Sequence, residues 1–128
     1  MTPEAEDYLD KARGDLDDAR KIAAIPLAKV AARSAYYAAF HAAEALIIER
    51  TGKVAKTHSG VRTEFARLLK GAPGAERTLL TFLAHAYKYK EIGDYGVGHG
   101  VVVTDEEAEE TIDAAARFVE RVTALLTP

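Results

Sequence analysis

The 128-residue sequence contains no cysteine and no tryptophan. Without cysteine the chain cannot form disulfides, use a thiolate nucleophile or build a zinc site on Cys ligands. No stretch approaches the roughly 18 consecutive apolar residues that a membrane span requires. The first residues, MTPEAEDYLD, are acidic, whereas a signal peptide begins basic and continues apolar. We therefore expect a soluble, cytoplasmic protein that does not bind membranes.

The histidines also lack the spacing of a metal site or a common catalytic motif. There are four of them, and none belongs to an HExxH or HxxxH pattern. The sequence has no nucleophile elbow, and Cys–His pairing is impossible. We expect no metal and no cofactor.

Alanine is present in excess, at 25 of 128 residues. Because alanine is the best helix former, and apolar residues recur three and four positions apart, the sequence predicts helices throughout. Five helices are expected over residues 3–24, 27–50, 59–70, 75–92 and 104–126. Their stop signals are Pro26, Gly52, Gly71 and Gly93, and TDEE at 104–107 forms a capping box. The connections are short, which favours antiparallel packing. The predicted fold class is all-α: one domain over residues 1–128, an up-and-down bundle of four to five helices.

The net charge of −3 hides a strong asymmetry along the chain. Residues 50–70 carry six basic side chains and only Glu64, whereas residues 1–24 and 104–128 carry an excess of acids. The basic segment includes His58 and could contact phosphates. The alternative is a solvated face whose charges pair with the acidic ends of the chain.

The predicted second helix carries polar residues on one side, within KVAARSAYYAAFHAAEALIIER. Arg33, Tyr37, His41 and Glu44 share a face at helical spacing, while alanines fill most other directions. Two interpretations stay open. The polar groups fix the register of helix packing, or they line a cleft that binds a nucleotide or RNA.

A lysine interrupts the apolar stripe of the predicted fourth helix. Lys90 lies in the expected last turn, where it would also complement the helix dipole. The segment KYKEIGDYG then brings Asp94 and Tyr95 just past the helix, and we expect Asp94 to reach Arg33 or Lys90. The glycine-rich loop that follows is unlike a phosphate loop, because no strand precedes it and acids follow it.

Several of these segments together resemble a known family. RSAYYAAFHAAEALI, KTHSGV, a basic residue four positions before DYG, and VTDEEAEETIDAAARFVERV occur in the order found in HEPN domains, in particular the small stand-alone prokaryotic branch. The resemblance covers nearly the whole chain. It implies an antiparallel helical bundle, a homodimer with the functional cleft at or near the dimer interface, and a place beside minimal nucleotidyltransferases in toxin–antitoxin pairs.

Several HEPN proteins are metal-independent ribonucleases that use an arginine and a histidine four to six residues apart. That spacing is absent here, and Lys90 stands where this branch commonly has arginine, so the sequence leaves enzymatic activity open. The first hypothesis is a HEPN-like protein that binds RNA or a nucleotide, or the toxin component of such a pair. The alternative is a non-catalytic module that dimerises and recruits a protein partner. The candidate binding residues are Arg33, Tyr37, His41, His58, Lys90, Asp94 and Tyr95.

Overall fold

The protein is described by a computed structural model over residues 1–23, 27–70, 77–95 and 102–127, without the side chains of residues 21–23 and 93–95. These ranges contain helices and no strand, which confirms the all-α prediction. The helices are α1 (Pro3–Ala23), α2 (Ala28–Thr51), α3 (His58–Leu69), α4 (Arg77–Tyr95) and α5 (Asp105–Leu126).

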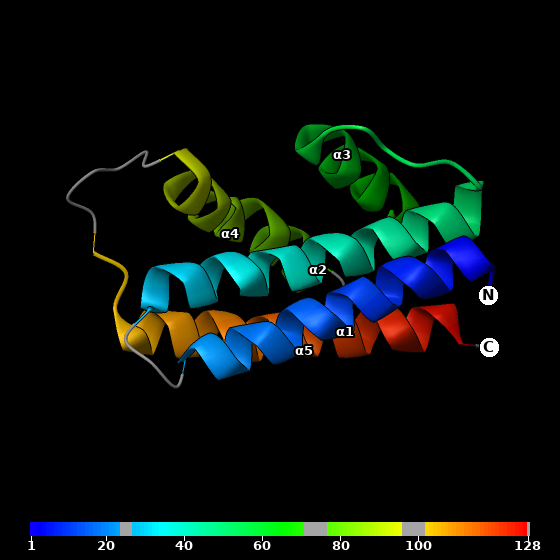
Figure 1. The fold of residues 1–128 in the computed structure, drawn as a ribbon. Coiled ribbons are helices and arrows are strands. Elements are labelled where there is room, and N and C mark those ends of the chain that lie inside the picture. The colour runs from blue at the N-terminus through cyan, green and yellow to red at the C-terminus, as the bar shows by residue number, and fades with distance from the viewer. Residues whose placement is uncertain (24–26, 71–76, 96–101, 128) are drawn as a thin grey trace.

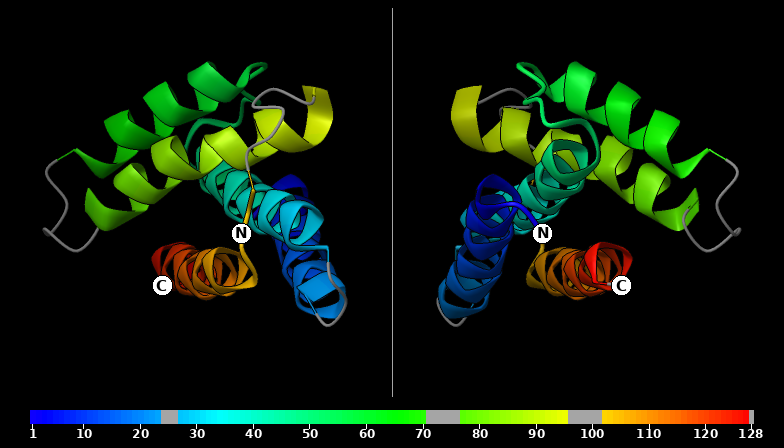
Figure 2. Two further views of the ribbon diagram at one scale, coloured as in Figure 1. Left: turned by 90° about the vertical axis from the view of Figure 1, so that its left-hand side faces the viewer. Right: turned by 90° about the vertical axis from the view of Figure 1, so that its right-hand side faces the viewer.

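Helix α2 is the centre of the bundle, and each of the other helices contacts it. Helix α1 runs antiparallel to α2, and α5 packs against both, so that the two ends of the chain lie at the same end of the molecule (Figure 1). Helices α3 and α4 form an antiparallel pair on the other side of α2 (Figure 2). This arrangement places the first half of α2 beneath α4 and its second half beside α3.

Four helix ends follow from local capping chemistry. Thr2 accepts a hydrogen bond from the amide of Ala5, and Thr57 accepts one from the amide of Gly60. Gly52 ends α2 with a φ of 73°, a left-handed conformation that favours glycine. Thr104 caps α5 by accepting from the amide of Glu107. The carboxylate of Glu107 accepts from the Tyr89 hydroxyl, which joins α4 to α5.

The prediction for the end of the fourth helix was wrong. Helix α4 continues through Gly93 to Tyr95, so Asp94 and Tyr95 belong to the helix and do not follow it. Glycine lowers helix propensity by about 1 kcal/mol, which tertiary packing can override. Lys90 therefore lies before the last turn, and its position is not explained by the helix dipole. Most of the glycine-rich loop, residues 96–101, lies outside the described residues.

The alanine-rich part of α2 is fully buried. All seven alanines between residues 32 and 45 have 0% exposure. Since a methyl group is the smallest side chain that still fills space, these alanines let α1 and α5 approach the α2 backbone closely. Larger side chains complete the core, among them Phe65 of α3, Leu83 of α4 and Phe118 of α5.

Two kinds of functional feature, a membrane-spanning helix and a metal-binding group, are not found among the described residues. Across the described ranges, no helix is long and apolar enough to cross a membrane. The same residues contain no group of three or more histidine and carboxylate side chains arranged to hold a metal ion.

Candidate functional site

Tyr36 and His58 form the centre of a group of aromatic and cationic side chains between α2, α3 and α4. The hydroxyl of Tyr36 lies 2.7 Å from Nδ1 of His58, the first residue of α3. Tyr36 is fully buried, and burial raises the pKa of its hydroxyl although nearby Arg62 opposes the shift. The Tyr36 hydroxyl therefore keeps its proton at neutral pH and can donate a hydrogen bond to Nδ1 of His58 when that nitrogen carries no proton.

The ring of His58 is enclosed by other rings. It stacks on Phe40 with centroids 4.3 Å apart, and lies 5.3 Å from the ring of Tyr87 on α4. Tyr37 contacts it edge-on at 5.9 Å. The histidine is thus held by α2 and α4, although it belongs to α3.

Two cations from different helices share one of these rings. The guanidinium of Arg62, on α3, lies 4.8 Å from the ring centroid of Tyr87, and the Lys90 ammonium lies 5.8 Å from the same centroid. Lys90 is only 7% exposed. Arg62 hydrogen-bonds to Tyr36, but its buried Nη1 atom has no hydrogen-bond partner among the residues that the structure describes. The ring of Tyr87 thus brings a cation from α3 and a cation from α4 into one group of side chains.

Arg33 extends this group along α2. Its guanidinium lies 4.8 Å from the ring centroid of Tyr37, which in turn contacts His58. We call these eight residues the aromatic–cation cluster: Arg33, Tyr36, Tyr37, Phe40, His58, Arg62, Tyr87 and Lys90.

His41 takes part in a different arrangement, although it shares a face with Tyr37. Its Nδ1 lies 2.7 Å from Oε1 of Glu44 on the same helix, and its Nε2 lies 3.4 Å from Oδ2 of Asp15 on α1. The imidazole therefore joins α1 to α2 between two carboxylates. For His41 and Glu44 this geometry favours the interpretation as packing residues that fix the register of the helices.

Asp15 makes this contact sensitive to pH. Burial is the main cause that raises the pKa of the Asp15 carboxyl, and Asp18 adds to the shift, whereas His41, Arg33 and Lys11 oppose it. A carboxyl whose pKa is raised on folding binds more protons in the folded state than in the unfolded state. Its contribution to stability is therefore lost as pH rises through the carboxyl range.

Asp15→Asn is expected to lose this pH dependence, since the amide cannot ionise. The free energy of unfolding of the variant, relative to the wild type, should rise as pH increases above 3.8, the ordinary pKa of an aspartate carboxyl. Urea unfolding at several pH values measures this difference, with Asp7→Asn as the control, because Asp7 is an exposed carboxylate on the same helix that is not among the groups shifting the Asp15 pKa. A relative stability that falls over this range would contradict the raised pKa.

The sequence predicted part of the cluster and missed part of it. Arg33, Tyr37, His58 and Lys90 lie in it, whereas the side chains of Asp94 and Tyr95 lie outside the described residues. Tyr36, Phe40, Arg62 and Tyr87 were not among the predicted binding residues. The available signal was helical spacing, because His58 and Arg62 are four residues apart and Tyr87 and Lys90 are three apart, so that each pair shares a face.

Comparison with known proteins identifies the family. Residues 5–125 match the HEPN domain. The chain belongs to the HEPN domain family. The UPF0332 protein glr0978 of Gloeobacter violaceus is 32% identical over 120 residues, which cover 94% of each chain. The HEPN resemblance based on the sequence motifs is thus confirmed. All residues of the aromatic–cation cluster lie within the matched range.

Proposed function

We propose that this HEPN protein binds RNA, and that the aromatic–cation cluster is the binding site. The observation that supports the proposal most strongly is the meeting of Arg62 and Lys90, from two helices, at the ring of Tyr87. A phosphate group could accept a hydrogen bond from Nη1 of Arg62, which has no partner among the described residues.

The aromatic rings favour single-stranded RNA over a free phosphate ion. Tyr37 is partly exposed, lies against Arg33, and belongs to the same group of rings as His58 and Phe40. Unpaired bases stack on such rings, and stacking contributes about 1–3 kcal/mol for each base. Single strands, loops and ends of RNA present bases in this way, whereas duplexes do not.

Cleavage of the RNA is a second candidate function, which the Tyr36–His58 hydrogen bond favours. When the Tyr36 hydroxyl donates to Nδ1, the other ring nitrogen of His58 carries the proton and can serve a bound phosphodiester. Arg62 would stabilise charge that develops on the phosphate. The arginine–histidine spacing of the family's ribonucleases is absent, so this chemistry would use residues of α2 and α3.

The experiment that tests both functions is incubation of the purified protein with total RNA in the presence of a chelator. We expect RNA to be retained by the wild type on a filter, and less RNA to be retained by Arg62→Met. Lys88→Met, which removes an exposed cation from α4, is the matched control. Shortened RNA would add the cleavage function. Absence of both retention and shortening would refute the proposal and leave the non-catalytic interaction module.

Family membership supports two further parts of the proposal. We propose that the protein forms a homodimer, and that it is the toxin-side partner of a minimal nucleotidyltransferase. Light scattering during gel filtration tests the first part, because a dimer has twice the 13.8 kDa mass of the chain. Co-expression with a nucleotidyltransferase of a related gene pair tests the second.

A further inference from the structure

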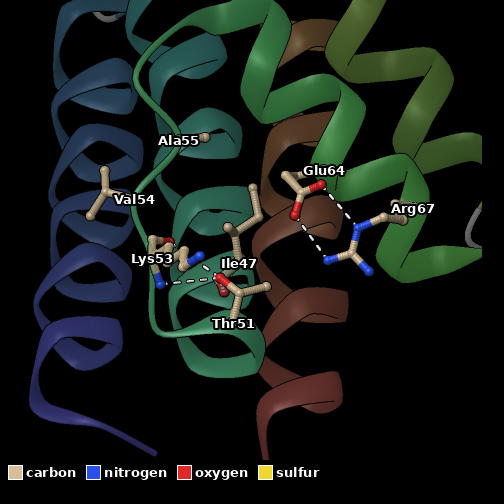
Figure 3. Close-up of a pocket in the computed structure, with 7 residues that line it drawn as sticks. All are labelled: Ile47, Thr51, Lys53, Val54, Ala55, Glu64 and Arg67. Carbon is tan, nitrogen blue, oxygen red and sulfur yellow. Dashed lines mark hydrogen bonds and ion pairs between the residues drawn. The ribbon is translucent and has the colours of Figure 1, made fainter.

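A pocket of about 360 Å³ lies between the end of α2, the chain that connects α2 to α3, and the second half of α3. Figure 3 shows its lining. It is separate from the aromatic–cation cluster, which uses the first turns of α3. We call it the α2–α3 pocket, and its lining residues are Ile47, Thr51, Lys53, Val54, Ala55, Glu64 and Arg67.

The wall of the pocket is held in place by local hydrogen bonds. Gly52 reverses the chain after α2 and donates its amide hydrogen to the carbonyl of Ile48, 2.8 Å away. The hydroxyl of Thr51 donates to the carbonyl of Ile47 at 2.7 Å and accepts from the amide of Lys53 at 3.1 Å. The connection therefore has a defined path, and the hollow beside it is built into the fold.

One side of the pocket is aliphatic and exposed. Val54 is 51% exposed, which makes it one of the few large apolar side chains on the described surface. Ala55 and Ile47 also contribute apolar atoms to the lining. An aliphatic side chain from a partner could enter the hollow and remove this apolar surface from water.

The pocket carries more positive than negative charge in its lining, because two cations and one carboxylate contribute to it. Lys53 and Arg67 line it, and Lys56 and Lys70 belong to the same basic segment. Lys53, Lys56 and Lys70 form no ion pair with any residue that the structure describes, so the predicted pairing of these charges with the acidic ends of the chain is not found for them. A partner with negative charge would complement this surface.

The carboxylate of Glu64 favours a peptide over a nucleic acid as the partner. Arg67 donates to both of its carboxylate oxygens, at 2.9 Å each, which holds a negative group in the pocket. A phosphate that entered the hollow would meet this carboxylate and an aliphatic wall. An aliphatic side chain flanked by carboxylates would leave Glu64 paired with Arg67 and place a carboxylate of its own beside Lys53.

We propose that the α2–α3 pocket binds an acidic peptide segment of a partner protein through one aliphatic anchor residue. The pocket receives the anchor against Val54 and Ala55, and the flanking carboxylates of the peptide contact the exposed lysines. This binding is additional to the proposed RNA binding and does not depend on it. It gives the positive charge of residues 50–70 a role in recruiting a protein.

The test is a fluorescence anisotropy titration of the full chain with a labelled peptide, Glu-Asp-Leu-Asp-Glu. A second peptide with glycine in place of leucine measures the anchor, and it should bind at least about fivefold more weakly because no apolar surface is covered. Val54→Ser should lower the affinity for the leucine peptide to that for the glycine peptide. Lys53→Glu should weaken both peptides by about tenfold or more, because it reverses a charge at the rim.

Lys29→Glu is the matched control, since it makes the same charge reversal at an exposed position in the first turn of α2. It should leave the affinity of the leucine peptide unchanged. Equal affinity for the two peptides, an equal effect of Lys29→Glu and Lys53→Glu, or no binding would overturn the proposal. Displacement of the peptide by oligouridylate, with the RNA affinity lowered by Val54→Ser, would assign the pocket to RNA.

Discussion

Lys90→Met weakens the binding of a single-stranded oligouridylate by about tenfold or more at low salt, if the aromatic–cation cluster is the RNA site. Lys90 is 7% exposed and lies 5.8 Å from the centroid of Tyr87. A cation in a partly buried place interacts with phosphate more strongly than one in open water, and a hydrogen bond to a charged group contributes about 1.5–3 kcal/mol. Methionine keeps the apolar stem of the side chain, so the variant removes charge with little loss of packing.

The dependence on salt separates a phosphate contact from a change in shape. If Lys90 contacts phosphate, the slope of log affinity against log salt should fall by about 1 in the variant. Lys88→Met should leave the affinity at low salt close to that of the wild type. Equal losses of affinity in the two variants would mean that RNA binding depends only on the net charge of the protein. An unchanged affinity in Lys90→Met would remove this residue from the site.

Ala39→Leu is expected to destabilise the protein by about 1–3 kcal/mol, because it forces a larger side chain into a filled space. Ala39 is 0% exposed and belongs to the run of seven buried alanines in α2. The rigid helices around α2 would have to separate to accept the added carbon atoms. Thermal and urea unfolding measure the loss as a lower melting temperature and a lower urea midpoint.

Ala84→Leu is the control for that substitution, since it adds the same atoms at an exposed position in α4. Leucine has nearly the helix propensity of alanine, so the control should change stability by less than about 0.5 kcal/mol. A similar effect of the two substitutions would mean that the alanines of α2 serve helix formation alone. The close approach of the helices would then have another cause.

The fold was predictable because its signals are local. Apolar spacing, proline and glycine predicted five helices, and Gly52 and Thr104 lie at helix ends as expected. The prediction failed at Gly93, where helix α4 continues to Tyr95. There the contacts of α4 with the rest of the bundle decide the outcome, and a sequence pattern contains no information about them.

The sequence could predict residues of the candidate site only where they share a face of one helix. Arg33 and Tyr37 share a face of α2, which helical spacing reveals. The contact of Tyr36 with His58 joins residues 22 positions apart, and it depends on how α3 crosses α2. His41 was predicted as a binding residue because it lies on the same face of α2 as Tyr37. The sequence pattern could not show that Asp15 of α1 contacts its imidazole.

An NMR titration of the isotope-labelled protein with a short oligouridylate would show whether RNA binds at the aromatic–cation cluster. We expect the largest shift changes at the side chains of His58, Arg62 and Lys90 and at the ring of Tyr87. Resonances of Val54 and Ala55, in the α2–α3 pocket, should stay in place. Shift changes confined to that pocket, or no shift changes at saturating RNA, would rule out RNA binding at the aromatic–cation cluster.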